Sequence, residues 1–276
     1  MDTRRGRWTV VLGYRSVRIS NFMVFHISHL AIVDSTNTYL KSLVDAPEGT
    51  CVSADEQTAG RGRQNRNWHS APGEGLYLSI LLRPPRGRTD LPLLSLTAAI
   101  AVAETFLAIG LEKIDLKWPN DLLCSERKIC GILVETAGLN QGGSPRVIVG
   151  IGVNLNQRAF PPPLDTTATS LLIESGAAMG AATFRDLLLE RFSEWYDCWR
   201  EEGREQILTR WTALSSYAAG REVSVKLESE SLTGITEGLN RDGALLVRTI
   251  DGDLRTIIAG EVSRLRPVNC APKKEA

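Results

Sequence analysis

The sequence has little of the chemistry that holds metals or cross-links a fold. Its five cysteines are scattered over 276 residues without a C-x-x-C pair, and it has only three histidines. This argues against a disulfide framework and a zinc site, and it fits the reducing cytoplasm. His26 and His29 lie three positions apart in an expected strand, so they face opposite sides and are not expected to share a metal ion.

Other absences argue against further classes of protein. No run of about 18 apolar residues occurs, so no membrane span is expected. The 32 basic side chains are balanced by 32 acidic ones, whereas proteins that bind duplex DNA are usually basic overall. The sequence contains neither G-x-G-x-x-G nor the Walker pattern G-x-x-x-x-G-K, so a nucleotide would have to be bound by a different device.

The length of the chain and the change of residue pattern near Gly220 predict one large and one small domain. Residues 1–22 are rich in arginine, and their apolar stretch is too short for a secretory signal. We expect a disordered or misassigned extension there, either an organellar transit peptide or a segment upstream of a true start at Met23. The large domain is expected over 23–218, the small domain over 219–268 and a frayed tail over 269–276.

Hydrophobic periodicity gives the expected elements. In the large domain, strands are expected over 24–33, 51–54, 76–82, 114–117, 121–124, 128–136 and 146–154, and helices over 36–43, 91–109 and 184–200. Asp34 or Ser35 would cap the first helix and Thr183 the last. From Gly220 onward, short alternating strands with Asp-Gly turns predict a small β-barrel. Because helices are segregated from strands, the large domain is expected to be α+β with a mixed or antiparallel sheet.

A loop of about twenty residues between Asp55 and Gly75 has no apolar period, and such loops are usually functional or disordered. Residues 60–68 read Gly-Arg-Gly-Arg-Gln-Asn-Arg-Asn-Trp, with three arginines and no acid. Glycines let backbone amides approach a ligand, and guanidinium groups match carboxylate and phosphate oxygens. Trp68 favours a clamp on an anionic ligand, because an aromatic ring can anchor the loop or stack on a base. The alternative is a solvated loop of the RNA-binding type.

A second motif, Lys-Trp-Pro-Asn-Asp over 117–121, is followed by Lys128 and Gly131. The tight turn expected at its centre would bring Lys117 and Lys128 near one pocket. A lysine at such a strand end can hold a carboxylate and an α-phosphate together, and a glycine lets a flat ligand lie against the strand. The alternative is a plain surface hairpin.

Two shorter motifs complete the set. Ser-Thr-Asn over 35–37 either caps a helix only or also hydrogen-bonds a neutral polar group such as a cyclic urea. Gly-Ile-Gly-Val-Asn over 150–154 ends an expected strand.

In this order, the four motifs resemble the biotin protein ligase family. The similarity runs from about residue 34 to 156 and resumes over 220–267, where Gly-Glu-Val-Ser at 260–263 resembles the family's C-terminal domain. The resemblance implies a class II synthetase-like biotin/lipoate ligase catalytic domain and a small SH3-like β-barrel. The departure is Gln64-Asn65, where family members often carry basic or glycine residues.

The resemblance also implies an ATP-dependent ligase that forms biotinyl-5′-AMP with Mg²⁺ and passes biotin to a lysine of the biotin carboxyl carrier protein of acetyl-CoA or a related carboxylase. Biotin would be bound by Ser35, Thr36, Asn37, Gln57, Gly60, Arg61, Lys128 and Gly131. The nucleotide would be bound by Arg63, Arg66, Trp68, Asn120 and Asn154. Lys128, Arg63 and Lys117 would be catalytic, and Asp121 would hold magnesium.

Two alternative functions stay open, one on the same fold and one of a different class. A lipoate ligase or octanoyltransferase shares the fold but would lack the arginine loop, and a nucleic-acid-binding module would use that loop without catalysis. About thirty residues precede the Ser-Thr-Asn motif, and a helix-turn-helix domain needs roughly twice that, so the monofunctional type without DNA binding is expected. The oligomeric state stays open, with a homodimer as one alternative.

Overall fold

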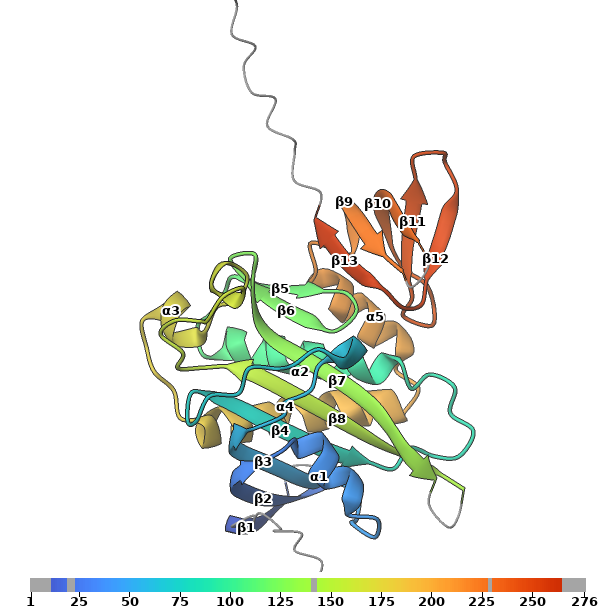
Figure 1. Ribbon diagram of the computed structural model, residues 1–276. Helices are drawn as coiled ribbons and strands as arrows, with labels where there is room; N and C mark the ends of the chain where they lie inside the picture. The colour runs from blue at the N-terminus through green and yellow to red at the C-terminus, as the bar shows by residue number, and fades with distance from the viewer. Residues whose placement is uncertain (1–10, 19–22, 140–142, 228–229, 265–276) are drawn as a thin grey trace, which may run out of the picture.

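A computed structural model describes residues 11–18, 23–139, 143–227 and 230–264. The chain forms an eight-stranded sheet with helices on both faces, followed by a five-stranded sheet (Figure 1). The strands of the large sheet are β1 (Val11–Arg18), β2 (Val24–Val33), β3 (Thr50–Gln57), β4 (Gly75–Leu82), β5 (Ile114–Lys117), β6 (Asp121–Cys124), β7 (Arg127–Leu139) and β8 (Pro145–Asn154). The helices are α1 (Thr36–Ser42), α2 (Leu93–Ala108), α3 (Leu171–Ser175), α4 (Ala181–Arg200) and α5 (Arg204–Ala213). The expected α+β class is confirmed.

The large sheet is mixed and has the order β1-β2-β3-β4-β8-β7-β6-β5. Its neighbouring strands are antiparallel except for β2 and β3. In Figure 1, α2 and α4 lie behind the sheet, while α1 lies in front and packs on β3, β4 and β8. The loop between β3 and β4 crosses the same front face. The front of the central strands is therefore the face on which that loop can act.

The centre of the sheet explains why its strands have apolar runs instead of a simple alternation. Every residue of β4 is buried, and so is every residue of β8 except Pro145 and Gly152. Strands covered on both faces are apolar throughout. The same argument applies to α2, which is buried between the sheet and the helices α4 and α5 and is apolar around most of its circumference.

The aromatic stripe of α4 belongs to this core, as its helical spacing predicts. Its buried members are Phe184, Phe192, Tyr196 and Trp199. The helix begins at Ala181 after Gly180, so the expected cap at Thr183 is wrong. Two alanines favour helix strongly enough to extend it by a turn toward its N-terminus. The segment between β8 and α4 contains the short helix α3.

The C-terminal sheet contains the strands predicted from residue 220 onward, in the order β12-β11-β10-β9-β13. They are β9 (Ala219–Lys226), β10 (Ser231–Leu239), β11 (Leu245–Thr249), β12 (Leu254–Ile257) and β13 (Glu261–Arg264). Both Asp-Gly pairs form the expected hairpin turns, with φ of +79° at Gly243 and +91° at Gly252. Only glycine adopts this backbone region without strain. The tail expected over 269–276 lies outside the described residues.

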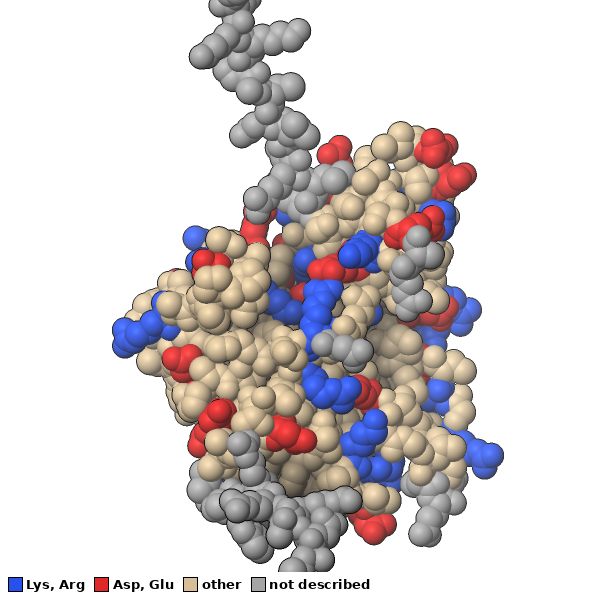
Figure 2. Space-filling view, in the orientation of Figure 1, with Lys and Arg blue, Asp and Glu red and all other residues tan. Residues whose placement is uncertain are grey.

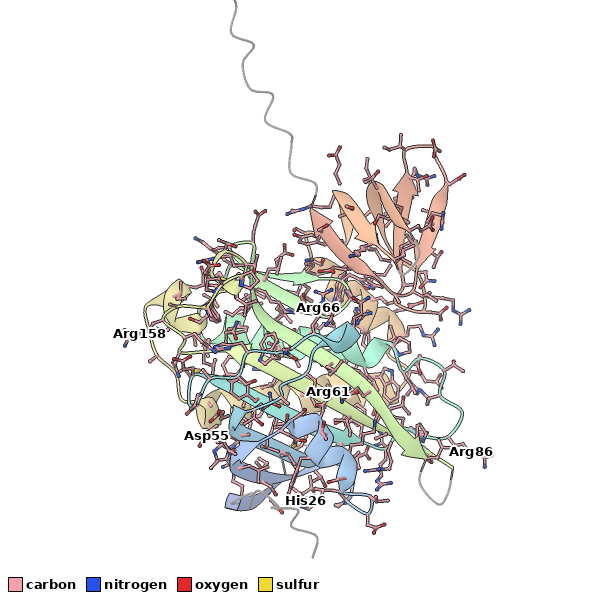
Figure 3. The ribbon with its side chains drawn as sticks, in the orientation of Figure 1. His26, Asp55, Arg61, Arg66, Arg86 and Arg158 are labelled. Atoms are coloured by element: carbon pink, nitrogen blue, oxygen red, sulfur yellow. The ribbon has the colours of Figure 1, made fainter. Side chains whose placement is uncertain are left out.

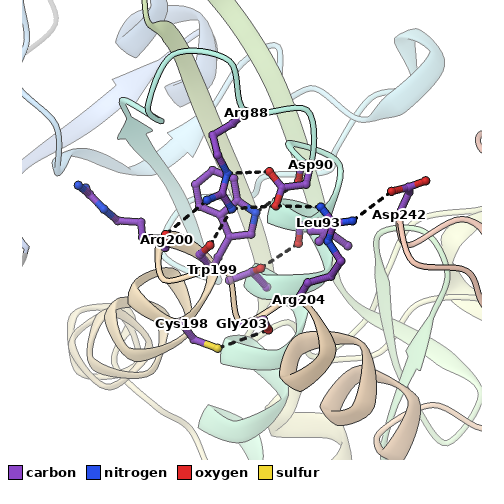
Figure 4. A network of polar contacts seen from close by, with 10 residues as sticks. Arg88, Asp90, Leu93, Cys198, Trp199, Arg200, Gly203, Arg204 and Asp242 are labelled. Atoms are coloured by element: carbon purple, nitrogen blue, oxygen red, sulfur yellow. Dashed lines mark hydrogen bonds and ion pairs between the residues drawn. The ribbon is translucent and has the colours of Figure 1, made fainter.

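The two domains are joined by one continuous core and by a polar network around α5. Buried residues of both sheets belong to a single apolar cluster. At the edge of that cluster, Arg204 lies 3.8 Å from Asp90 and 3.4 Å from Asp242 of the C-terminal domain (Figure 4). Arg88 binds both carboxylate oxygens of Asp90 at 2.8 Å. The position of the C-terminal domain is thus fixed by the start of α2 and by α5.

The expectation that residues 1–22 lie outside the fold is wrong for Val11–Arg18. These residues form β1, which pairs antiparallel with β2 and makes one edge of the large sheet. The strand contains Arg15 and Arg18, which an edge strand tolerates because it pairs with only one described neighbour. Residues 1–10 and 19–22 lie outside the described part of the chain. Within the described helices, none is both long and apolar enough to cross a membrane.

Candidate active site

The front face of the large sheet holds a cavity of about 940 Å³ between the β3–β4 loop, the strands β5 to β8 and the edge of the C-terminal domain. Every site residue expected from the sequence lines this cavity, except Gly60. A Cβ atom at Gly60 would lie 2.5 Å from the carbonyl oxygen of Trp68, so this glycine lets the two arms of the loop meet. Its role in the structure is to close the loop, and contact with a ligand stays a prediction.

One end of the cavity is polar and uncharged. Ser35 caps α1, and the neighbouring Thr36 donates its backbone N–H and its hydroxyl to Oε1 of Gln57, at 2.9 and 3.1 Å. Nε2 of Gln57 donates to Ser70 at 2.9 Å, while the hydroxyl of Ser79 lies 2.7 Å from that of Thr36. Capping and cavity lining are therefore combined in one motif. This end of the cavity offers hydroxyl and amide groups suited to a neutral polar ligand.

Beside this end, a partly buried carboxylate connects the sheet to the loop. Glu135 of β7 accepts a hydrogen bond from Nδ2 of Asn37 at 2.9 Å and forms an ion pair with Arg61 at 2.9 Å. A Cβ atom at Gly150 would lie 2.3 Å from Oδ1 of Asn37, so the first glycine of the 150–154 motif makes room for that asparagine. The ion pair with Glu135 thus holds Arg61, near the start of the loop, against β7.

The other two arginines of the loop reach different partners. Arg63 donates to Oδ1 of Asn120 at 3.3 Å, and Arg66 donates to Oε1 of Glu261 in the C-terminal domain at 3.0 Å. Figure 3 shows Arg61 in front of the sheet and Arg66 nearer the C-terminal domain. Figure 2 shows basic side chains gathered over the middle of this face. The loop therefore spans the cavity and is attached at both of its sides.

Trp68 lies flat against the two central strands. A Cβ atom at Gly131 of β7 would lie 2.8 Å from its ring, and one at Gly152 of β8 would lie 2.5 Å from it. Its indole nitrogen is buried without a hydrogen-bond partner. A buried unpaired donor is costly, which fits a site where a ligand would supply the acceptor. The glycines thus form a flat floor, and Trp68 covers part of it.

The second motif forms the charged end of the cavity. Strands β5 and β6 pair through the Lys-Trp-Pro-Asn-Asp turn, with Lys117 opposite Asp121. The ammonium of Lys128, on β7, lies 2.6 Å from Oδ1 of Asp121 and 5.3 Å from the ring centre of Trp68. The turn brings both lysines to one pocket, as the sequence predicts.

Burial changes the acid–base properties of this end. Desolvation lowers the pKa of Lys117, the Asp121 carboxylate opposes that shift, and the charge of Lys128 adds to it. Burial likewise lowers the pKa of Arg63, but a guanidinium remains charged in proteins. Poorly solvated cations interact strongly with an anion that enters the cavity, so this end is suited to phosphate and carboxylate groups.

Asn154 lines the cavity, but its amide is committed to the fold. Nδ2 donates to the carbonyl oxygens of Thr169 at 2.9 Å and of Lys128 at 3.4 Å. It therefore fixes the backbone that carries Lys128, and direct contact with a nucleotide stays a prediction.

Glu135, Glu261 and Gly152 are among the residues around the cavity that were not predicted as site residues. Glu135 looks like an ordinary strand residue, and Glu261 was noted only as part of the Gly-Glu-Val-Ser segment. Their arginine partners are 74 and 195 positions away. Gly152 had a signal, because glycines at positions 150 and 152 interrupt a β-branched strand with a period of two. That period places both on one face, where they make room for Asn37 and Trp68.

Two family models match the chain. Residues 30–154 match the biotin/lipoate A/B protein ligase family, and residues 219–265 match the biotin protein ligase C terminal domain. The bifunctional ligase/repressor BirA of Escherichia coli (strain K12) is 32% identical over 86% of this chain and 73% of its own length. The biotin--[acetyl-CoA-carboxylase] ligase of Paracoccus denitrificans is 35% identical over 79% of this chain and 92% of its own length.

A solved structure is also similar to this chain. The biotin protein ligase from Aquifex aeolicus, solved in complex with biotin and ATP, superimposes with a TM-score of 0.76 and 34% identity, covering 87% of this chain and 98% of that protein. The first matched region runs from the end of β2 to the end of β8, and the second covers the C-terminal sheet. The chain belongs to the biotin protein ligase family.

Proposed function

We propose that this protein activates biotin with ATP and transfers it to a lysine of a biotin carboxyl carrier domain. The observation that carries the proposal is the polarity of the cavity. Uncharged hydroxyl and amide groups line one end, two lysines and Arg63 line the other, and a flat glycine floor joins them. Biotin has matching parts, namely a neutral urea, a thin ring system and a carboxylate at the end of a chain.

In the first step, a carboxylate oxygen of biotin forms a bond to the α-phosphorus of ATP, and the bond to the β-phosphate oxygen breaks. Biotinyl-5′-AMP and pyrophosphate result. The two reacting groups are both anionic, so the step requires positive charge that is already in place. Lys128 would contact both groups, Lys117 and Arg63 would stabilise the phosphates, and no side chain is needed as a nucleophile.

Magnesium is part of this proposal through Asp121. Among the described residues, no group of three His, Cys, Asp or Glu side chains could hold a metal ion by itself. Mg²⁺ at nucleotide sites is commonly held by one or two carboxylates together with phosphate oxygens, and Asp121 at the charged end fits that arrangement. The ion would neutralise charge on the phosphates, while Asp121 would then share its oxygens between the ion and Lys128.

In the second step, the acceptor lysine attacks the acyl carbon with its neutral amine, AMP leaves, and the amine loses a proton. The mixed anhydride has to survive in water until the acceptor arrives. Closure of the arginine loop over it would exclude water. The acceptor domain is expected to dock along β7, where residues 133–139 pair only with β8 among the described strands, so one edge is free for an added strand.

The uncharged end of the cavity favours biotin over lipoate or octanoate. Ser35, Thr36 and Gln57 have oxygen atoms with further lone pairs that the N–H groups of a urea can use, in addition to the hydrogen bonds they already make. An alkyl or dithiolane tail offers these oxygens no donor, so it gains no hydrogen bond at this end of the cavity.

Labelled biotin, MgATP and a purified carboxyl carrier domain test the proposal. We expect label to appear on the carrier domain with one AMP released per biotin, and no label when the acceptor lysine is replaced by arginine. Parallel reactions with lipoate and octanoate should release AMP at least about tenfold more slowly. AMP release with lipoate but not with biotin would overturn the proposal.

We further infer that the protein works in the cytoplasm and does not bind DNA. Cys51, Cys124, Cys130 and Cys198 are free thiols, which suits a reducing compartment. The 32 basic side chains are balanced by 32 acidic ones, whereas proteins that bind duplex DNA are usually basic overall. In an electrophoretic mobility shift experiment, the protein should not shift duplex DNA, either with or without biotin and ATP.

A further inference from the structure

Trp118 occupies the middle of the Lys-Trp-Pro-Asn-Asp turn, yet its indole N–H is used by the other domain. The side chain is buried, and Nε1 donates to the carbonyl oxygen of Gly243 at 3.0 Å. Gly243 belongs to the hairpin turn between β10 and β11. A buried hydrogen bond therefore connects the charged end of the cavity to a turn 125 positions away in the C-terminal domain.

The hairpin turn that accepts this bond is rigid. The side-chain oxygen of Asn240 accepts the backbone N–H groups of Asp242 and Ala244, both at 2.9 Å. Gly243 has a φ of +79°, and a Cβ atom there would lie 2.7 Å from Leu93 at the start of α2. Asp242 is also paired with Arg204 of α5. The turn is thus held against helices α2 and α5, and it can hold Trp118 in place.

On its other side, Trp118 holds residues that line the cavity. Lys117, Asn120 and Asp121 all do so, and Asn120 joins the arginine loop to β7 by accepting from Arg63 and donating to the carbonyl oxygen of Ile132. The neutral end of the cavity is built on α1 and β3 and has no part in this chain of contacts. A shift of the turn would therefore change the charged end and leave the neutral end in place.

We propose that Trp118 is a positioning residue through which the Asp242-Gly243 turn of the C-terminal domain holds the ATP-binding half of the active site. The inference rests on the proposed biotin activation. The C-terminal domain would thus contribute to ATP recognition in two ways. Some of its residues border the cavity directly, and its hydrogen bond to Trp118 acts indirectly by holding the turn in place. Recognition of the urea end of biotin, at the neutral end of the cavity, does not depend on this link.

Two variants remove the link from opposite sides. Trp118→Phe deletes the indole donor and keeps an aromatic ring in the core. Gly243→Ala drives a methyl group into Leu93 and displaces the turn. Gly252→Ala is the matched control, because this glycine occupies the other Asp-Gly turn of the same domain, has a φ of +91°, and has no atom near its would-be Cβ. Any effect of backbone strain alone is therefore present in the control.

We expect Trp118→Phe and Gly243→Ala to raise the KM for ATP in adenylate synthesis about fivefold or more, the equivalent of about 1 kcal/mol. The Kd for biotin alone, measured by calorimetry, should stay within about twofold of wild type, and Gly252→Ala should resemble wild type in both. Because the two changes break one link, the double variant should be no worse than Gly243→Ala.

Wild-type protein that forms no biotinyl-5′-AMP would refute the proposed function itself. If wild type is active, three results would overturn the positioning role: an unchanged KM for ATP in both variants despite a lowered Tm, an equal effect of Gly252→Ala, or fully additive effects in the double variant. A parallel loss of biotin affinity would show general damage to the site and would also overturn it.

Discussion

Lys128 is the side chain on which adenylate formation should depend most. Its side chain is 34% exposed, its ammonium is paired with Asp121 at 2.6 Å, and it lies at the charged end of the cavity. We expect Lys128→Ala to reduce pyrophosphate release at least about 100-fold, because it removes charge from the place where two anions meet. The Tm should change little, since a partly exposed ion pair contributes little to stability.

Lys113→Ala serves as the control for that experiment, because this lysine is exposed and lies just before β5, outside the cavity. It should release pyrophosphate at the wild-type rate. A Lys128→Ala variant that also does so would exclude a role for Lys128 in the chemistry.

Lys117 should make ATP binding sensitive to alkaline pH. Burial lowers its pKa, so in the folded protein it loses its charge at a lower pH than an ordinary lysine does. The cation is complete well below that pKa and is lost as pH rises through it. The KM for ATP should therefore rise toward alkaline pH in wild type, while Lys117→Arg should flatten the profile because a guanidinium stays charged. Identical profiles in both proteins would contradict this assignment.

Local motifs sufficed to find most side chains around the cavity. Ser35, Thr36 and Lys117 each belong to a short motif, and the four motifs are specific in combination although each has other uses alone. Glu135 has no such signal, because its meaning depends on Arg61 and Asn37, which reach it only in the folded chain. A sequence read along one strand does not show which long-range partner a carboxylate will meet.

The loop from residue 58 to residue 70 should act mainly on retention of the intermediate. Its arginines attach it to β7, to the Lys-Trp-Pro-Asn-Asp turn and to the C-terminal domain. We expect Arg63→Ala to speed loss of bound biotinyl-5′-AMP about tenfold, since a hydrogen bond from a charged group is worth about 1.5–3 kcal/mol. Synthesis of the adenylate should fall by a smaller factor. Release of labelled adenylate from isolated complex measures the first quantity and a single-turnover reaction the second.

Arg86→Ala is a suitable comparison for that variant, because this arginine lies on the molecule's surface away from the loop (Figure 3). It should release the adenylate as wild type does. Equal release from Arg63→Ala and wild type would show that the loop does not retain the intermediate through this arginine.

Strands and helices with long apolar runs were predicted well, and those that depend on neighbours were not. β2, β4, β8 and α2 are apolar enough to be recognised alone. The helix α5 was missed, because its apolar side consists mainly of Ile207 and Trp211 among charged residues. The strand β1 was excluded for its arginines, although an edge position accepts them. In both cases the element gains its stability from what it packs against.

The shared core predicts that the two domains unfold together. Trp211 of α5 is buried in the apolar cluster that contains residues of both sheets. Trp211→Ala should lower the free energy of unfolding by about 3–5 kcal/mol, the usual cost of truncating a buried tryptophan. The exposed neighbour Thr212→Ala should change it by no more than about 0.5 kcal/mol. Denaturation followed by circular dichroism and by tryptophan fluorescence should give one coincident transition that shifts as a whole. Two separate transitions, with only one of them shifted in Trp211→Ala, would mean that the C-terminal sheet folds independently of the helices that hold it beside the active site.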